Sequence, residues 1–140
     1  MPPREMPMPR FAWLGALMIL GLLATACGDA CGDAEDRLVT MSDLPCSMTT
    51  ADGVWESHPL PPVTDERCYW LEFRGCSKYE FENPLGRVPS LVVGYTSFEQ
   101  DGRFSTVGSG NSFVVQEASA STVTIRNAQN QFFYLRLILE

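Results

Sequence analysis

Hydrophobic and polar side chains alternate along the chain from Cys68 onward. In residues 71–74 and again in residues 79–82, an apolar side chain stands at every second position and a charged one lies between. A period of two is typical of a strand with one buried face and one solvent-exposed face. Only four residues separate the two runs, and we therefore expect them to form a hairpin.

Five more apolar or β-branched runs follow, separated by segments rich in Gly, Ser, Ala and Asn. They cover residues 91–98, 103–107, 113–117, 122–127 and 132–139. The Asp-Gly pair between the first two is a strong hairpin signal. Short strands with a turn every eight to twelve residues or so indicate an all-β domain. We predict an antiparallel β-sandwich of about seven strands, with a small barrel as the alternative.

The last of these runs, residues 132–139, is apolar at nearly every position. A strand without a polar face is usually central in its sheet and covered on both sides. The C-terminal segment is therefore expected to lie within the core.

Residues 38–67 carry no such alternation. Ser42 is a candidate N-cap for one short helical turn, and Pro45 would end it. Pro59, Pro61 and Pro62 favour an extended conformation that lacks ladder donors. We interpret residues 38–67 as an irregular proline-rich cap wrapped over the body of the domain.

The first 26 residues have the pattern of an export signal. Arg4 and Arg10 precede the segment 11–26, which contains no charged residue and ends in small residues. A helix that spans a bilayer needs about 20 apolar residues, and this run is shorter, as in a secretory signal peptide.

The end of the signal, Leu-Ala-Thr-Ala at residues 23–26 followed by Cys27, resembles the lipobox of bacterial lipoproteins. That resemblance implies a lipid on Cys27, which would become the first residue of the mature protein. The alternative is ordinary cleavage after Ala26, which would leave Cys27 as a thiol. Because Asp29 lies one position beyond the site that directs retention in enteric bacteria, the resemblance favours the outer membrane.

Cysteine usage agrees with lipidation at Cys27. Five cysteines are present, and removing Cys27 leaves an even number, which an exported chain can oxidise to disulfides: Cys31, Cys46, Cys68 and Cys76. Three pairings are possible. We expect Cys68 to pair with Cys76, because they bracket one hairpin-like segment, and Cys31 to pair with Cys46. The predicted organisation is a signal peptide (1–26), a lipid-anchored acidic spacer (27–37), the proline-rich cap (38–67) and the β-sandwich core (68–140).

Composition limits the chemistry that this domain could perform. The net charge of −7 argues against nucleic-acid binding. Acidic residues near the start of the mature chain do not match a calcium-loop pattern, so no metal or cofactor is expected. His58 is the only histidine, and it lies in the proline-rich segment rather than on a scaffold that could position a nucleophile. Glu72, Glu80 and Glu82 are candidates for a carboxylate pair across the first hairpin, although the solvent-exposed face of that hairpin is the preferred explanation for them.

Aromatic side chains are the remaining candidates for a binding surface. Trp70, Trp55 and Tyr95 are named for this role, and Trp70 is expected to be either exposed or covered by the acidic N-terminal segment. The sequence thus predicts a bacterial envelope protein, exported and held at the membrane by lipid. Its β-domain would be non-catalytic and would bind a protein or glycan or serve a structural role. The alternatives are an envelope hydrolase that uses the hairpin glutamates and a small-barrel carrier of an apolar ligand.

Overall fold

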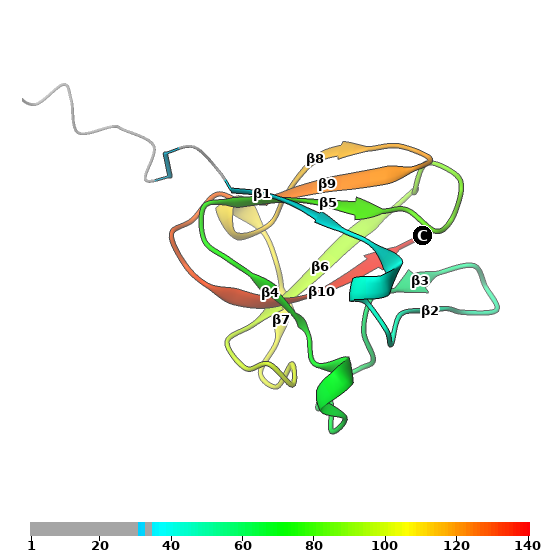
Figure 1. Cartoon of the computed structure of the whole chain (residues 1–140), viewed down its shortest axis with the longest axis horizontal. Coiled ribbons are helices and arrows are strands. Elements are labelled where there is room, and N and C mark those ends of the chain that lie inside the picture. Colours follow the sequence, from blue (N-terminus) through cyan, green and yellow to red (C-terminus); the bar gives the residue numbers. More distant parts are fainter. Residues whose placement is uncertain (1–30, 33–34) are drawn as a thin grey trace, which may run out of the picture.

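The structure is a computed structural model that describes residues 31–32 and 35–140. Its described residues form two β-sheets with three short 3-10 helices in the connections (Figure 1). The first sheet has the strand order β1-β5-β9-β8, with β1 at Glu35–Val39, β5 at Ser77–Glu82, β9 at Thr122–Asn127 and β8 at Val114–Ala118. Strand β1 runs parallel to β5, and the other neighbours are antiparallel.

The second sheet is organised around the C-terminal strand. Its order is β2-β3-β10-β6-β7, with β2 at Met48–Thr49, β3 at Trp55–Glu56, β10 at Phe133–Leu139, β6 at Val92–Ser97 and β7 at Thr106–Val107. Strand β4 (Leu71–Phe73) pairs with the first half of β10, on the same side as β3. Strand β10 therefore has neighbours on both sides, as its apolar sequence predicts.

The two sheets pack face to face, which confirms the predicted disulfide-stapled β-sandwich. The sheets of the described chain do not close into a barrel. Inward-facing side chains alternate with outward-facing ones along β5 and β9. The inward-facing side chains of both sheets, with neighbouring connections, fill one core: Val39, Leu44, Trp55, Phe73, Tyr79, Phe81, Phe113, Val123, Ile125, Phe133, Leu135, Leu137 and Leu139.

A further layer covers the outer face of the second sheet. The segment from Ser57 to Trp70 folds across it and buries a second apolar cluster of Val63, Cys68 and Trp70. Tyr95 on β6 and Tyr134 on β10 pack against this cluster. Residues 57–70 thus form a loop over the body of the domain, and β10 is buried on both of its faces.

The strand pairings match the prediction in part. The hairpin β6–β7 forms as expected, and β8 and β9 form another. The hairpin expected between residues 71–74 and 79–82 does not form, because β4 pairs with β10 while β5 pairs with β1 and β9. Gly75 and Cys76 instead carry the chain from one sheet to the other. Cys76 has a φ of 56°, a left-handed conformation that turns the chain sharply.

The described residues form ten strands, where about seven were predicted. The additional ones come from the segments interpreted as spacer and cap: β1 begins within the former, and β2 and β3 lie within the latter. These strands are too short, or too rich in charge, to show a clear alternation. The predicted helical turn is the 3-10 helix η1 (Met41–Asp43), whose N-cap is Thr40 rather than Ser42.

Two disulfides join the described cysteines. Cys31 pairs with Cys76 and Cys46 with Cys68, so the preferred pairing of sequence neighbours is wrong. Cys68 and Cys76 lie on either side of β4, not across a hairpin, which removes the reason for joining them. Disulfides form and persist in oxidising compartments, and these two indicate an exported protein. Across the described residues, no helix has the length and apolarity needed to cross a bilayer.

Candidate functional site

The side chain of Trp70 is buried, contrary to the expectation that it is exposed. It retains 3% of its accessible surface. Gly102 packs against the indole so closely that a Cβ there would lie 2.5 Å from it, and the indole Nε1 donates a hydrogen bond to the Pro59 carbonyl at 3.4 Å. The described groups that cover Trp70 thus come from the proline-rich loop and the β6–β7 turn, not from the acidic segment 27–37.

The other two predicted aromatics do not form an exposed surface either. Trp55 lies in the main core with 2% exposure. Tyr95 is half-buried on the outer face of the second sheet, and the guanidinium of Arg136 lies over its ring at 5.7 Å. Cys27, the predicted lipidation site, lies outside the described residues.

His58 takes part in a buried polar network beneath the cap. Its Nδ1 lies 2.8 Å from Ser57 Oγ, which also accepts the Leu137 backbone N–H at 2.8 Å. The Ser57 hydroxyl can therefore donate a hydrogen bond to Nδ1 of His58 when the imidazole is neutral. Burial, and then the nearby Arg136 charge, lower the pKa of His58 to about 4. The imidazole is therefore neutral at physiological pH.

Arg136 connects this network to the edge of the cap. Its Nε donates to the His58 carbonyl at 2.8 Å, and its Nη2 donates to the carboxylate of Glu56 at 2.8 Å. Ser57 and His58 are only 1% and 3% exposed, so a substrate has no access to the hydroxyl. The arrangement ties the cap to β10, and we assign it a structural role.

The glutamates considered as a hydrolytic pair are divided between the two sheets. Glu72 lies on β4, on the outer face of the second sheet, while Glu80 and Glu82 lie on β5, on the outer face of the first. Glu72 pairs with Arg74 at 3.6 Å, and Glu82 accepts the Met41 backbone N–H at 2.8 Å. The expected opposition of Glu72 and Glu80 across a hairpin is absent because that hairpin does not form.

Three phenylalanines that the sequence analysis did not single out are exposed where β6 ends and β10 begins. Phe98, Phe104 and Phe132 have exposures of 69%, 93% and 37%; we call Phe98 and Phe104, which both lie in the connection between β6 and β7, the phenylalanine surface. Phe98 contacts Phe133 with ring centroids 5.3 Å apart, and Phe132 contacts Tyr134 at 5.0 Å. Ser97 Oγ donates to the Arg103 carbonyl at 2.6 Å, which brings the residues before Phe98 and Phe104 together.

Phe104 is unusual in its backbone as well as its exposure. Its φ is 55°, in the left-handed region that bulky side chains rarely occupy. Because the Phe104 ring is exposed, its burial contributes no stabilisation that could offset the backbone conformation, which costs about 1–2 kcal/mol. Strain of this kind is concentrated at functional sites, so Phe104 is the strongest candidate for a binding residue. No sequence pattern indicated this role for Phe104, because residues 103–107 have the pattern of a strand.

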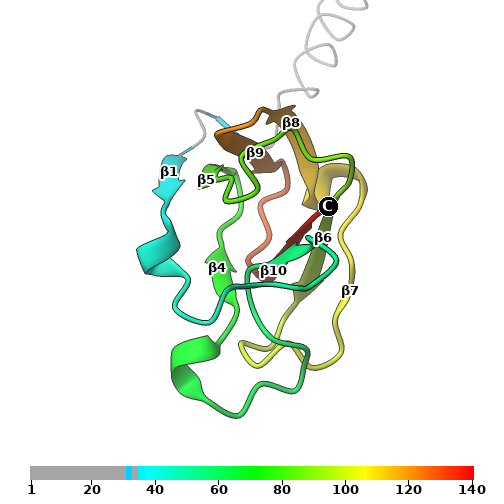
Figure 2. The same ribbon diagram turned by 90° about the vertical axis from the view of Figure 1, so that its right-hand side faces the viewer.

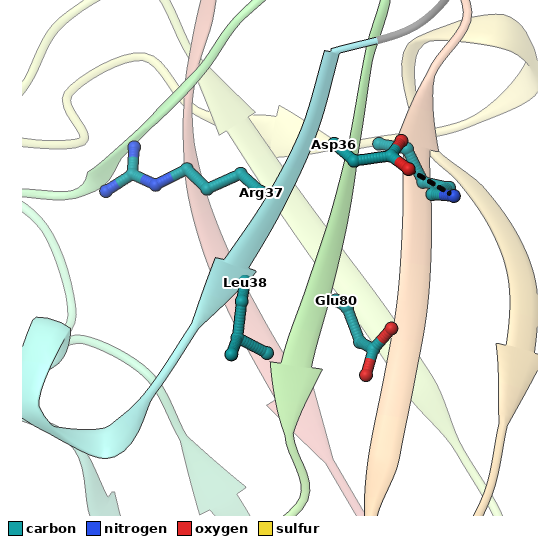
Figure 3. Close-up of a pocket in the computed structure, with 5 residues that line it drawn as sticks. Asp36, Arg37, Leu38 and Glu80 are labelled. Atoms are coloured by element: carbon teal, nitrogen blue, oxygen red, sulfur yellow. Dashed lines mark ion pairs between the residues drawn. The ribbon is translucent and has the colours of Figure 1, made fainter.

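A second feature is a pair of hollows on either side of β1. Asp36, Arg37, Leu38, Lys78 and Glu80 line one of about 270 Å³ (Figure 3). The other, of about 250 Å³, is lined by Glu35, Arg37, Arg74 and Tyr79. Arg37 lines both hollows, and its guanidinium lies 5.5 Å from the centre of the Tyr79 ring. Among the residues described, no group of three or more His, Cys, Asp or Glu side chains is arranged to hold a metal ion.

Comparison with known proteins does not assign a function. No protein-family model, curated protein or solved structure matches this chain. The functional argument therefore rests on the residues and their geometry.

Proposed function

We propose that the protein is a bacterial envelope lipoprotein whose β-sandwich binds a protein or a glycan and catalyses no reaction. In this proposal, Cys27 carries the lipid, residues 1–26 direct export, and the outer membrane is the destination. The resemblance of residues 23–27 to a lipobox supports the anchor. The disulfides add support, because the four other cysteines pair with one another and neither bond requires Cys27.

The exposure and backbone conformation of Phe104 are the main support for the binding role. A side chain that is 93% exposed on a strained backbone is retained at a cost to the free energy of folding. Rigid aromatic rings are the residues that most often dominate binding energy at interfaces. The phenylalanine surface offers such rings at one end of the second sheet.

Non-catalytic behaviour is supported by the placement of the titratable groups. The single histidine is enclosed with Ser57 beneath the cap, and the candidate carboxylates lie on opposite outer faces of the sandwich. A general acid or base must reach the proton that it transfers.

The anchor is tested by replacing Cys27 with Ser. We expect the wild-type protein to fractionate with membranes and to incorporate a fatty-acid probe, and the Cys27→Ser variant to do neither. Membrane association and labelling of the variant at wild-type levels would contradict the proposal.

The binding surface is tested by photocrosslinking in the native envelope. A photoreactive amino acid is placed at position 104 and, as a control, at position 88. Val88 is also an exposed apolar residue, with 60% exposure, but it precedes β6 whereas the phenylalanine surface follows it. We expect a discrete crosslinked product from position 104 that Phe98→Ser weakens. Equal crosslinking at both positions, or no effect of Phe98→Ser, would contradict a role for this surface.

A further inference from the structure

Strand β1 is a free and regular sheet edge. It ends the strand order of the first sheet, and among the described residues only β5 pairs with it. Figure 2 shows it at the outer margin of the domain. An unpaired edge presents backbone donors and acceptors that can pair with another chain.

The other sheet edges are poor templates for such pairing. Strands β2 and β7 have two residues each, and β4 has three. Strand β8 is longer but carries a register shift between Val115 and Glu117. Short strands and bulges are means by which proteins block edge pairing. Only β1, with five residues in unbroken register, lacks these features.

The phase of the β1–β5 ladder shows which backbone groups face outward. The Glu35 N–H donates to the Cys76 carbonyl at 3.3 Å, and Glu35 is in register with Ser77. Bonding groups alternate along a parallel strand, so Glu35, Arg37 and Val39 bond to β5. The N–H and C=O groups of Asp36 and Leu38 consequently point toward the free edge.

The side chains of β1 define what could pair with it. Asp36 forms an ion pair with Lys78 at 2.9 Å, and Glu35 lies 3.9 Å from Arg74. No carboxylate in the described part of the chain forms an ion pair with Arg37. In Figure 3, Arg37 points to the side of β1 opposite β5, away from Leu38 and Glu80.

We infer that the free edge of β1 binds an extended peptide segment of a partner protein by strand addition, with an acidic side chain opposite Arg37. A strand added at this edge would bond to Asp36 and Leu38, and its side chains would alternate between the two hollows. The residue opposite Arg37 would enter the hollow that Arg74 and Glu35 also line. Arg74 already has Glu35 and Glu72 nearby, so the guanidinium open to a carboxylate there is that of Arg37. Its neighbours would lie beside the exposed side chain of Leu38, which favours β-branched residues.

This site is separate from the phenylalanine surface, and none of the residues that form it is the proposed lipid attachment site. If the edge of β1 binds no peptide, the proposed function is unaffected. If the phenylalanine surface or the lipid anchor fails its own test, the inference about β1 is likewise unaffected.

The test uses the full-length protein in detergent and a displayed library of random nine-residue peptides. We expect enriched peptides to carry an acidic residue between β-branched residues. In Leu38→Pro, proline removes only the outward-facing N–H of β1, and peptide affinity should fall about tenfold. Leu38→Thr keeps that N–H and should bind within about twofold of wild type. Arg37→Gln should cost up to about fivefold and abolish the preference for an acidic residue.

Thermal unfolding and disulfide mapping of each variant confirm that the sandwich is intact. Should Leu38→Pro fail to fold, Arg37→Gln and the acidic preference still decide the question. A library without enrichment would overturn the inference, as would peptides that bind wild type and Arg37→Gln equally.

Discussion

Cys31 is bonded to Cys76 although 45 residues separate them in the chain. Cys31 lies just before β1 and Cys76 just before β5, so the disulfide joins the starts of two parallel strands. Parallel neighbours cannot be linked by a tight turn. The disulfide therefore holds the starts of β1 and β5 together, as a tight turn holds two antiparallel strands together in a hairpin.

The two disulfides should differ in their contribution to stability. Removing Cys31–Cys76 by double replacement with Ser should lower the free energy of unfolding by about 4 kcal/mol, and removing Cys46–Cys68 by about 3 kcal/mol. The longer loop restricts the unfolded chain more, and the separations are 45 and 22 residues. Denaturant unfolding of both variants measures the difference. A larger loss from Cys46–Cys68 would contradict the loop-length argument.

Stability should depend on pH through His58. The pKa of His58 is about 4 in the folded protein, against its ordinary value of 6.5, so the unfolded chain binds more protons between these values. The free energy of unfolding should therefore rise as the pH increases from about 4 to 6.5, by about 3 kcal/mol in total. Because the chain has one histidine, its imidazole resonances report the folded pKa directly.

The control for this prediction is His58→Gln, in which this part of the pH dependence should disappear. An imidazole that titrates near 6.5 in the folded protein would show that His58 is not buried beneath the cap.

Gly102 should be far less tolerant of substitution than Gly53. Both have a left-handed backbone, with φ of 78° and 80°, but only Gly102 packs against the Trp70 indole. Gly53→Ala should cost about 1 kcal/mol for the backbone alone, and Gly102→Ala about 1–3 kcal/mol more for the displaced ring. Thermal unfolding gives both values. Equal losses would mean that the indole does not lie against Gly102.

Phe104→Asn should stabilise the domain, by about 1 kcal/mol, since asparagine tolerates the left-handed conformation and phenylalanine does not. The same change should weaken crosslinking at the phenylalanine surface when the photoreactive group is placed at position 98. Opposite effects on stability and binding distinguish a functional residue from a structural one. A destabilised Phe104→Asn variant would show that the ring contributes packing energy.

The sequence pattern was sufficient for the fold class because alternation reports the burial of each side chain. It also located the central C-terminal strand, since residues 133–139 have no polar face except at Arg136. Arg136 itself is buried because His58 and Glu56 supply its partners, and those partners lie about 80 positions earlier. Local patterns do not reveal such distant pairs.

Strand pairing was the main error, and the disulfide error followed from it. Alternation shows that residues 71–73 and 77–82 are strands but does not identify their neighbours. The wrong expectation for Trp70 has a similar origin. Trp70 does lie on the outer side of the sheet, but the proline-rich loop and Gly102 cover it there. Phe104 could not be found because its left-handed backbone depends on the packing of the whole β6–β7 turn.

The central place of β10 has a consequence for how the domain is made. Strands β3, β4 and β6 all precede β10 in the chain, and each pairs with it. During synthesis or export from the N-terminus, these three strands emerge before the strand that joins them into one sheet. The second sheet can therefore assemble only after nearly the whole chain has emerged. Such late assembly suits a protein that is exported before it folds, because the second sheet is complete only once β10 has joined its neighbours.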